Sequence, residues 1–147
     1  MAAMKGIITA LVGILTVMVA SGDAVTDLRP IIKEAAAQNG IDPVLMEAII
    51  RLESGHATSN AARTKNNLAG IMGRKTLRSY GSKEECIRHL GSILANYKAR
   101  GRVTVAQISS AYSQSRGVWA ARVTSFMGQI RSGRWGNIEM YEGGSTK

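Results

Sequence analysis

The amino-acid sequence predicts a single, mainly α-helical domain with a small loop or hairpin lobe beside a cleft. The chain has 147 residues, enough for one well-packed core and too few for two. Its composition, 45% hydrophobic and 20% charged, is that of a globular protein. Apolar residues recur at helical spacing through most of the chain. No segment shows a convincing strand alternation, apart from a candidate hairpin at residues 69–80.

Start and stop signals divide the chain into helices. The second predicted helix is apolar around most of its circumference, so we expect it to be central and buried. Residues 54–81 have the composition of a loop or small lobe, with a short helical turn at 60–64, and residues 137–147 read as a flexible polar tail. The expected helices are residues 27–38 (N-cap Asp27, stop Asn39-Gly40), 42–53 (N-cap Asp42, then Pro43), 82–100 (capping box Ser82 and Glu85), 104–112 (capping box Thr104 and Gln107) and a last helix that carries Trp119 and Ile130 and ends before Gly133.

Residues 1–24 form a separate segment. Lys5 precedes an uncharged apolar stretch that reaches Gly22, and small residues follow. A basic start, an apolar middle and a small-residue end are typical of a secretory signal peptide. Cleavage after Gly22 and cleavage after Ala24 are both open, and an uncleaved membrane anchor is the alternative, since a spanning helix needs about 20 apolar residues. In each case we expect the domain, residues 25–136, to be exported to the periplasm or the extracellular side.

The chain is strongly basic, with 19 Lys and Arg against 10 Asp and Glu and a formal net charge of +9. Such a charge favours polyanions, and for an exported protein the nearest polyanion is the anionic cell envelope. Nucleic acid is disfavoured as a partner because the basic residues are scattered from Arg29 to Arg134. A basic surface that only keeps the protein soluble is the third interpretation. We expect a monomer.

The sequence predicts neither a metal site nor a cofactor. Cys86 is the only cysteine, so no disulfide can form within the chain, and its position indicates the buried face of a helix. His56 and His89 lack the cysteine or carboxylate pattern of a metal site. A nucleophile pairing of Cys86 with His89 has no third group to orient it.

Glu53 is the predicted catalytic residue. It ends the apolar run that contains Ile49, Ile50 and Leu52. Burial disfavours the charged form of a carboxyl, so this position raises its pKa and keeps a proton available near neutral pH. The alternative is a surface glutamate at a helix C-terminus, where the helix dipole disfavours a carboxylate.

A second motif follows, with the sequence Asn66-Asn67-Leu68-Ala69-Gly70-Ile71. Together with residues 45–55 it resembles the glucosaminidase family of peptidoglycan hydrolases, glycoside hydrolase family 73, in which this segment closes the floor of the sugar groove behind the acid. The resemblance covers about residues 28–132 and implies a lysozyme-like fold. It also implies substrate-binding roles for Asn66, Asn67, Leu68 and Gly70.

The resemblance extends to four further residues. Tyr112 lies where the family has a tyrosine that faces the active site, which implies a substrate-positioning hydroxyl; a core tyrosine is the alternative. Trp119 resembles an aromatic residue of the last helix, and we assign it to packing. Glu84 and Glu85 open a helix, where the dipole favours them, and are not expected to be catalytic.

One feature departs from two-carboxylate glycosidases: no Asp or Glu lies between Ser54 and Lys83. Either the acetamido group of the substrate attacks the anomeric carbon, or Glu53 acts as acid and then base to form an anhydro product, as in lytic transglycosylases. We expect hydrolysis of the glycan strand of peptidoglycan, of the endo-β-N-acetylglucosaminidase type. The alternatives are a lytic transglycosylase and a non-catalytic cell-wall-binding domain.

Overall fold

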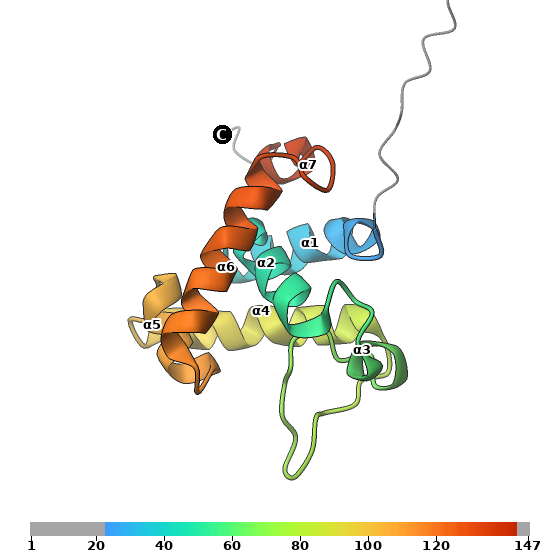
Figure 1. Cartoon of the computed structure of the whole chain (residues 1–147), viewed down its shortest axis with the longest axis vertical. Helices are drawn as coiled ribbons and strands as arrows, with labels where there is room; N and C mark the ends of the chain where they lie inside the picture. Colours follow the sequence, from blue (N-terminus) through green and yellow to red (C-terminus); the bar gives the residue numbers. More distant parts are fainter. Residues whose placement is uncertain (1–22, 144–147) are drawn as a thin grey trace, which may run out of the picture.

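The computed structural model describes residues 23–143, which are mainly helical (Figure 1). No β-strand forms within this range. The elements are η1 (Thr26–Leu28), α1 (Arg29–Asn39), α2 (Pro43–Ser54), α3 (Asn60–Thr64), α4 (Lys83–Ala99), α5 (Val105–Tyr112), α6 (Arg116–Arg131) and α7 (Glu139–Glu142).

Helix α2 is the centre of the fold, as its all-round apolar surface predicts. It packs against α6 on one side and α1 on another, while α1 also packs against α4 and α5 packs against α6 (Figure 1). Its residues Met46, Ile49 and Ile50 are fully buried. The last turn of α2 therefore emerges from the core between α6 and the long loop that precedes α4.

Most of the predicted helix boundaries are confirmed. Gly40 ends α1 in a left-handed conformation at φ 63°, and the Asp42 carboxylate accepts a hydrogen bond from the Val44 backbone N–H at the start of α2. Thr104 and Gln107 form the predicted capping box. The Ser82 hydroxyl caps α4, but the Glu85 carboxylate accepts from the Gly81 N–H instead of the Ser82 N–H.

The prediction for the first helix was wrong at its start. Asp27 lies inside the 3-10 turn η1, and α1 begins at Arg29 without a side-chain cap. Asp23 takes the expected role one turn earlier, because its carboxylate accepts hydrogen bonds from both the backbone N–H and the hydroxyl of Thr26.

The predicted hairpin at residues 69–80 does not form, and the alternative of a loop is what the structure contains. A single bridge joins Met72 to Leu77, and the Gly73 N–H donates to the Thr76 carbonyl at the tip of this projecting loop (Figure 1). The segment between them is exposed and contains Arg74 and Lys75. Too few residues pair to build a two-stranded ribbon, which is marginal in water even when complete.

The structure also differs from the flexible tail predicted at 137–147. Residues 139–142 form α7, and the Tyr141 hydroxyl donates to Glu47 Oε2 at 2.8 Å. The Asn137 carbonyl accepts a hydrogen bond from Arg29 Nη1 at 3.0 Å. These contacts dock residues 137–143 on the helical core, and residues 144–147 lie outside the described part.

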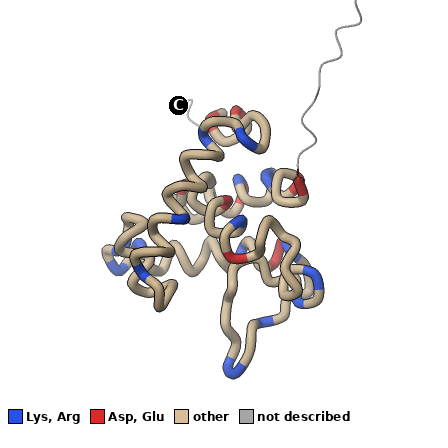
Figure 2. Tube along the Cα trace, viewed as in Figure 1, with Lys and Arg blue, Asp and Glu red and all other residues tan. Residues whose placement is uncertain are grey.

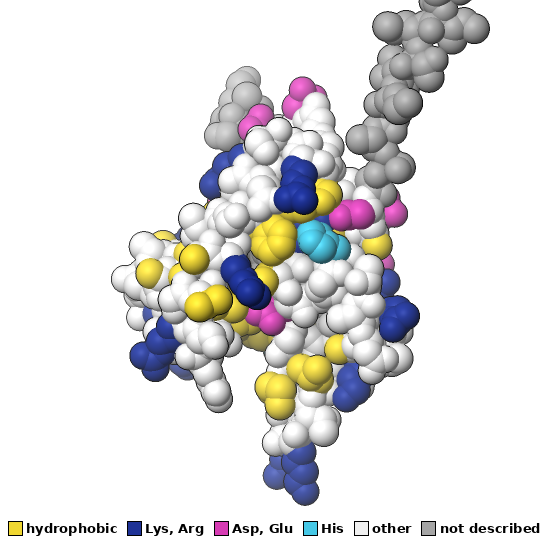
Figure 3. Space-filling model, in the orientation of Figure 1, with side chains coloured by type: hydrophobic (Ala, Val, Ile, Leu, Met, Phe, Trp, Pro, Cys, Tyr) yellow, Lys and Arg dark blue, Asp and Glu magenta, His cyan; other side chains and the backbone are white. Residues whose placement is uncertain are grey.

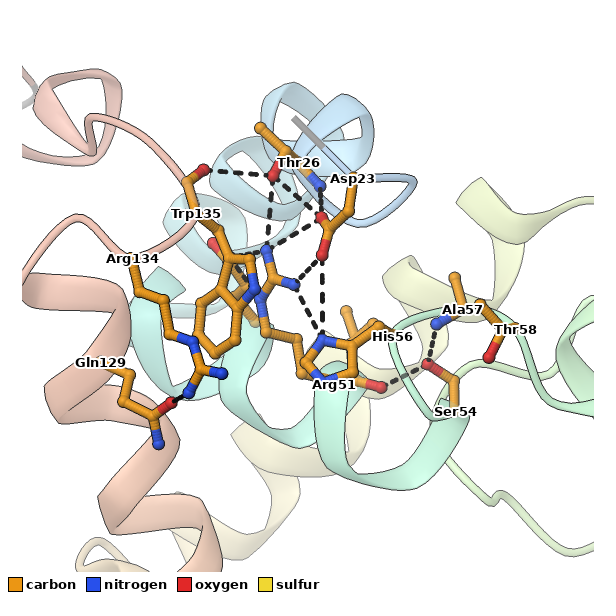
Figure 4. Close-up of polar contacts among 12 residues, drawn as sticks. Asp23, Thr26, Arg51, Ser54, His56, Ala57, Thr58, Gln129, Arg134 and Trp135 are labelled. Carbon is orange, nitrogen blue, oxygen red and sulfur yellow. Dashed lines mark hydrogen bonds and ion pairs between the residues drawn. The ribbon is translucent and has the colours of Figure 1, made fainter. Parts of the chain in front are cut away.

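A buried ionic cluster holds α1, α2 and the first described residues together. The Glu47 carboxylate, which is fully buried, accepts hydrogen bonds from Arg29 and Arg51 at 2.9–3.0 Å. Arg51 extends from Glu47 to Asp23, and its guanidinium lies 4.1 Å from the centre of the Trp135 ring (Figure 4). The cluster therefore contains two cations and two carboxylates, so its buried charges balance. Removing one partner of such a buried pair costs about 3–5 kcal/mol.

Basic side chains are spread over several elements of the described surface (Figure 2). They include residues of α3, α4, α6 and the projecting loop, as the scattered sequence pattern predicts. Between residues 23 and 143, no helix is both long enough and apolar enough to cross a membrane. The predicted leader, except for its last two residues, lies outside the described residues.

Candidate active site

Glu53 lies in the last turn of α2, where the helix emerges from the core. The helix stops directly after it, because Gly55 adopts the left-handed conformation at φ 54° and the Ser54 hydroxyl accepts a hydrogen bond from the Ala57 N–H. The Glu53 side chain is half-buried. The sequence prediction of a carboxyl at the edge of an apolar helix is confirmed.

Trp119 of α6 fixes the orientation of the Glu53 carboxyl. Its indole Nε1 lies 2.5 Å from Glu53 Oε1, and its side chain is 5% exposed. The Tyr112 ring stacks on the Trp119 indole, with ring centres 5.0 Å apart and an interplanar angle of 27°. Sequence reasoning assigned Trp119 to packing alone and missed its hydrogen bond, because nothing in the sequence indicates which residue of α2 its indole N–H faces.

Gly70 lies against the other oxygen of the same carboxyl. A Cβ atom placed on Gly70 would be 2.9 Å from Glu53 Oε2, closer than side chains tolerate, and φ is 64°. Glycine at this position therefore serves two purposes, the backbone conformation and the approach of the loop to Glu53. The structure thus brings together Glu53 and the Asn66–Ile71 motif that the sequence singled out.

Asn67 organises this motif internally. Its side chain is 1% exposed and makes four hydrogen bonds to the backbone: its Nδ2 donates to the carbonyls of Ile71 and Arg78, and its Oδ1 accepts from the N–H groups of Ala69 and Ile71. These bonds close the loop into a compact turn behind Glu53.

The other motif residues also have well-defined contacts. Leu68 is fully buried, and its N–H donates to the Cys86 sulfur at 3.3 Å. Asn66 is half-buried, has φ of 51°, and donates its amide to the Tyr80 carbonyl. The Tyr112 hydroxyl donates to the Ala69 carbonyl, which ties the motif to α5. Gly70 and Tyr112 line a cavity beside this loop, whereas Asn66, Asn67 and Leu68 line neither that cavity nor the one at Glu53.

The environment of Glu53 raises its pKa. Burial disfavours the charged carboxylate and so raises the pKa, and this is the larger effect. The hydrogen bond from Trp119 stabilises the charge and lowers the pKa by a smaller amount. Its place at the C-terminal end of α2 acts in the same direction as burial. The result is the perturbed titration that general acids of glycosidases require.

Glu53 lines one cavity, and Gly70, which lies against its carboxyl, lines another. The first, of about 450 Å³, is lined by Glu53, Trp119, Arg122 and neighbouring residues, and the second, of about 220 Å³, is lined by Gly70, Tyr112 and others. Within the described chain, no carboxyl other than Glu53 lines either cavity.

Cys86 and His89 lie apart from the candidate acid, and the structure shows the contacts of each. Cys86 is buried as predicted, burial raises the pKa of its thiol, and its sulfur faces the loop backbone. His89 instead pairs with the Tyr80 hydroxyl at 2.7 Å, so the nucleophile pairing with Cys86 does not form. Among residues 23–143, no cluster of His, Cys, Asp or Glu could hold a metal ion.

A half-buried carboxyl with a raised pKa, hydrogen-bonded to an indole at the edge of a cleft, is a feature that glycoside hydrolases use for their general acid. The sequence profile of the glucosaminidase family, described as mannosyl-glycoprotein endo-beta-N-acetylglucosaminidase, matches residues 29–132. The chain belongs to this family and is a glycoside hydrolase that acts on the glycan strand of peptidoglycan. No curated protein matches the sequence.

Proposed function

We propose that Glu53 is the general acid that protonates the glycosidic oxygen. The observation that carries this proposal is the juxtaposition of its carboxyl with Trp119 on one side and Gly70 on the other, at the edge of two cavities. Burial raises the pKa of Glu53, which favours the protonated form that a general acid needs.

The hydrogen bond from Trp119 distinguishes the two oxygens of the Glu53 carboxyl. An indole N–H can only donate, so Glu53 Oε1 must accept from Trp119. When the carboxyl is protonated, we place the proton on Oε2, the oxygen beside Gly70, because the indole leaves that oxygen unoccupied. Because Gly70 has no side chain, the leaving oxygen of the substrate has room to approach Oε2 from the groove.

We further propose that the substrate supplies the second catalytic group. A retaining or inverting glycosidase needs a second carboxylate within about 5–10 Å of the acid. In the described chain, no carboxyl besides Glu53 lines either cavity, and two other carboxyls are already paired: Glu47 is buried between two arginines, and Asp23 pairs with Arg51. An attack by the 2-acetamido group on the anomeric carbon fits this arrangement, and the family name supports cleavage after N-acetylglucosamine.

A lytic transglycosylase with the same single carboxyl is the second candidate, and the same observation supports it. The two reactions differ in their products. Hydrolysis adds water and leaves a reducing end, whereas the transglycosylase forms a 1,6-anhydro ring without water. Mass analysis of fragments from defined peptidoglycan distinguishes them, and anhydro ends would refute hydrolysis.

The role of Glu53 is tested with Glu53→Gln, which keeps the shape of the side chain and removes the proton. We expect turnover to fall by a factor of about 10² or more while the melting temperature stays close to that of the parent. Glu84→Gln is the matched control, because Glu84 lies at the start of α4 and lines neither cavity. Turnover by Glu53→Gln equal to that of the parent would rule out Glu53 as the acid.

A peptidoglycan hydrolase acts at the cell wall, and its basic surface is suited to the anionic envelope around it. We propose that the leader exports the domain, either as a signal peptide cleaved after Gly22, which keeps Asp23 and its pairing with Arg51, or as a membrane anchor, and that the domain acts as a monomer. N-terminal sequencing of the protein recovered from cells distinguishes the two forms of the leader.

A further inference from the structure

The cavity beside Glu53 continues along α6. Another cavity, of about 260 Å³, is lined by Phe126, Gln129 and others. It shares Leu52 and Arg122 with the cavity of about 450 Å³ that contains Glu53. The residues of α6 that line the two cavities recur three or four positions apart, so they form one stripe on the helix. The cleft therefore extends from the acid toward the C-terminal end of α6.

Three aromatic rings lie at this end of the cleft: Phe126 of the stripe itself, His56 and Trp135. Phe126 contacts His56 and Trp135, with ring centres 5.5 and 5.8 Å away, and His56 lies 5.3 Å from Trp135. The buried Arg51 lies against Trp135 from the core side. All three rings are half-exposed, and Figure 3 shows the histidine of this face next to hydrophobic and basic side chains. Such fixed, partly exposed rings offer apolar surface to the C–H faces of a sugar.

His56 adds a directed hydrogen-bond donor. Its Nδ1 lies 3.1 Å from Arg51 Nη1, and because a guanidinium can only donate, Nδ1 accepts and Nε2 carries the hydrogen. Burial and the nearby charges of Arg51 and Arg134 lower the pKa of His56, while Asp23 raises it, so the neutral form of the ring is favoured. Within residues 23–143, its Nε2–H has no partner.

Two exposed guanidinium groups flank the rings. Arg122 lies between the two cavities, and Arg134 lies over the Trp135 ring at 5.0 Å and donates to Gln129. Neither arginine forms an ion pair with a described residue. Guanidinium groups bind carboxylates in a bidentate manner, so this surface suits a ligand that combines a sugar face with a carboxylate. We call this surface the distal groove: Arg122, Phe126 and Gln129 line its cavity, and His56, Trp135 and Arg134 adjoin that cavity through their contacts with Phe126 and Gln129.

We propose that the distal groove binds a part of the glycan strand that carries a stem peptide, with the sugar on the aromatic rings and a peptide carboxylate on Arg122 or Arg134. The occupant follows from the continuity with the cavity at Glu53 and from the charge, because a strand docked at Glu53 must extend along the cleft. The inference rests on the proposed function, since it takes Glu53 as the point of cleavage. It makes the enzyme selective for peptide-bearing strands over bare glycan.

Binding to the Glu53→Gln protein tests this selectivity without turnover. The probes are soluble glycan strands with their stem peptides and the same strands after an amidase has removed the peptides. We expect tighter binding of the peptide-bearing strands. Adding Arg122→Gln or Arg134→Gln should lower the ratio of the two affinities about tenfold, as expected for loss of a charge-assisted hydrogen bond. Phe126→Ala should weaken binding of both strands.

Arg131→Gln is the matched control, because it removes one charge from α6 at a site paired with Asp42 outside the distal groove. Equal affinity for the two strand types would overturn the inference. So would an equal loss of selectivity in Arg131→Gln, since it would show an effect of net charge alone. A parent protein that selects peptide-bearing strands but cleaves neither type would refute the proposed function and leave the distal groove supported.

Discussion

Replacing Gly70 by alanine tests the contact between the Asn66–Ile71 motif and the acid. The added Cβ would lie 2.9 Å from Glu53 Oε2, about 0.5 Å short of the 3.4 Å at which ordinary contact begins. The carboxyl cannot swing aside at no cost, because Trp119 holds its other oxygen at 2.5 Å. Either the loop or the carboxyl must therefore move by several tenths of an ångström.

Two effects follow, and they can be measured separately. The left-handed conformation of an alanine at φ 64° costs about 1–2 kcal/mol of stability, or roughly 4–8 °C in melting temperature. Since a displacement of about 1 Å can cost a factor of about 10² in rate, we expect kcat on defined peptidoglycan to fall between about tenfold and a hundredfold.

Gly101→Ala separates strain from displacement. Gly101 has φ of 78°, and an added Cβ would meet nothing within 4 Å. We expect it to lose a similar amount of stability and to keep the kcat of the parent. The reasoning is refuted if Gly70→Ala retains the parental kcat, or if Gly101→Ala loses as much kcat as Gly70→Ala does.

Three further substitutions test the surroundings of the site. Trp119→Phe removes the donor that lowers the pKa of Glu53, so the alkaline limb of the pH–kcat profile should move to higher pH; an unchanged limb would contradict the role of Trp119. Asp23→Asn should lower the free energy of unfolding by about 2 kcal/mol at pH 7. Burial raises the pKa of Asp23, but the hydrogen bonds to Arg51 and Thr26 outweigh it, so the pKa is about 2 in the folded protein against 3.8 in the unfolded chain. That stability is present above pH 3.8 and is lost as the pH falls toward 2, so urea titrations of parent and variant should converge there. Tyr112→Phe keeps the stack on Trp119 but leaves the carbonyl of the buried Ala69 without this donor, so we expect kcat to fall and the free energy of unfolding to decrease by about 1–3 kcal/mol.

The sequence was sufficient where local chemistry decides the structure. Asp42, Pro43 and the Thr104–Gln107 capping box determined helix boundaries because each acts on backbone groups within one turn. The sequence was insufficient at Asp27, which was predicted as an N-cap but lies inside η1. Asp23 instead binds Thr26 and Arg51 at this end of the chain. The docking of α7 depends on the hydrogen bond from Tyr141 to Glu47, which lies far away along the chain. No local sequence pattern predicts a contact between residues so far apart.

The candidate site divides in the same way. The sequence by itself determined that Glu53 ends an apolar helix and that an asparagine–glycine loop follows, since both depend on residue type and order alone. Only the tertiary structure decided that Trp119 contacts one oxygen of the acid and Gly70 the other, that Glu47 is neutralised by Arg29 and Arg51, and that the cleft continues along α6. These features arise where helices cross, and there the packing of side chains distant in the chain selects which atoms meet.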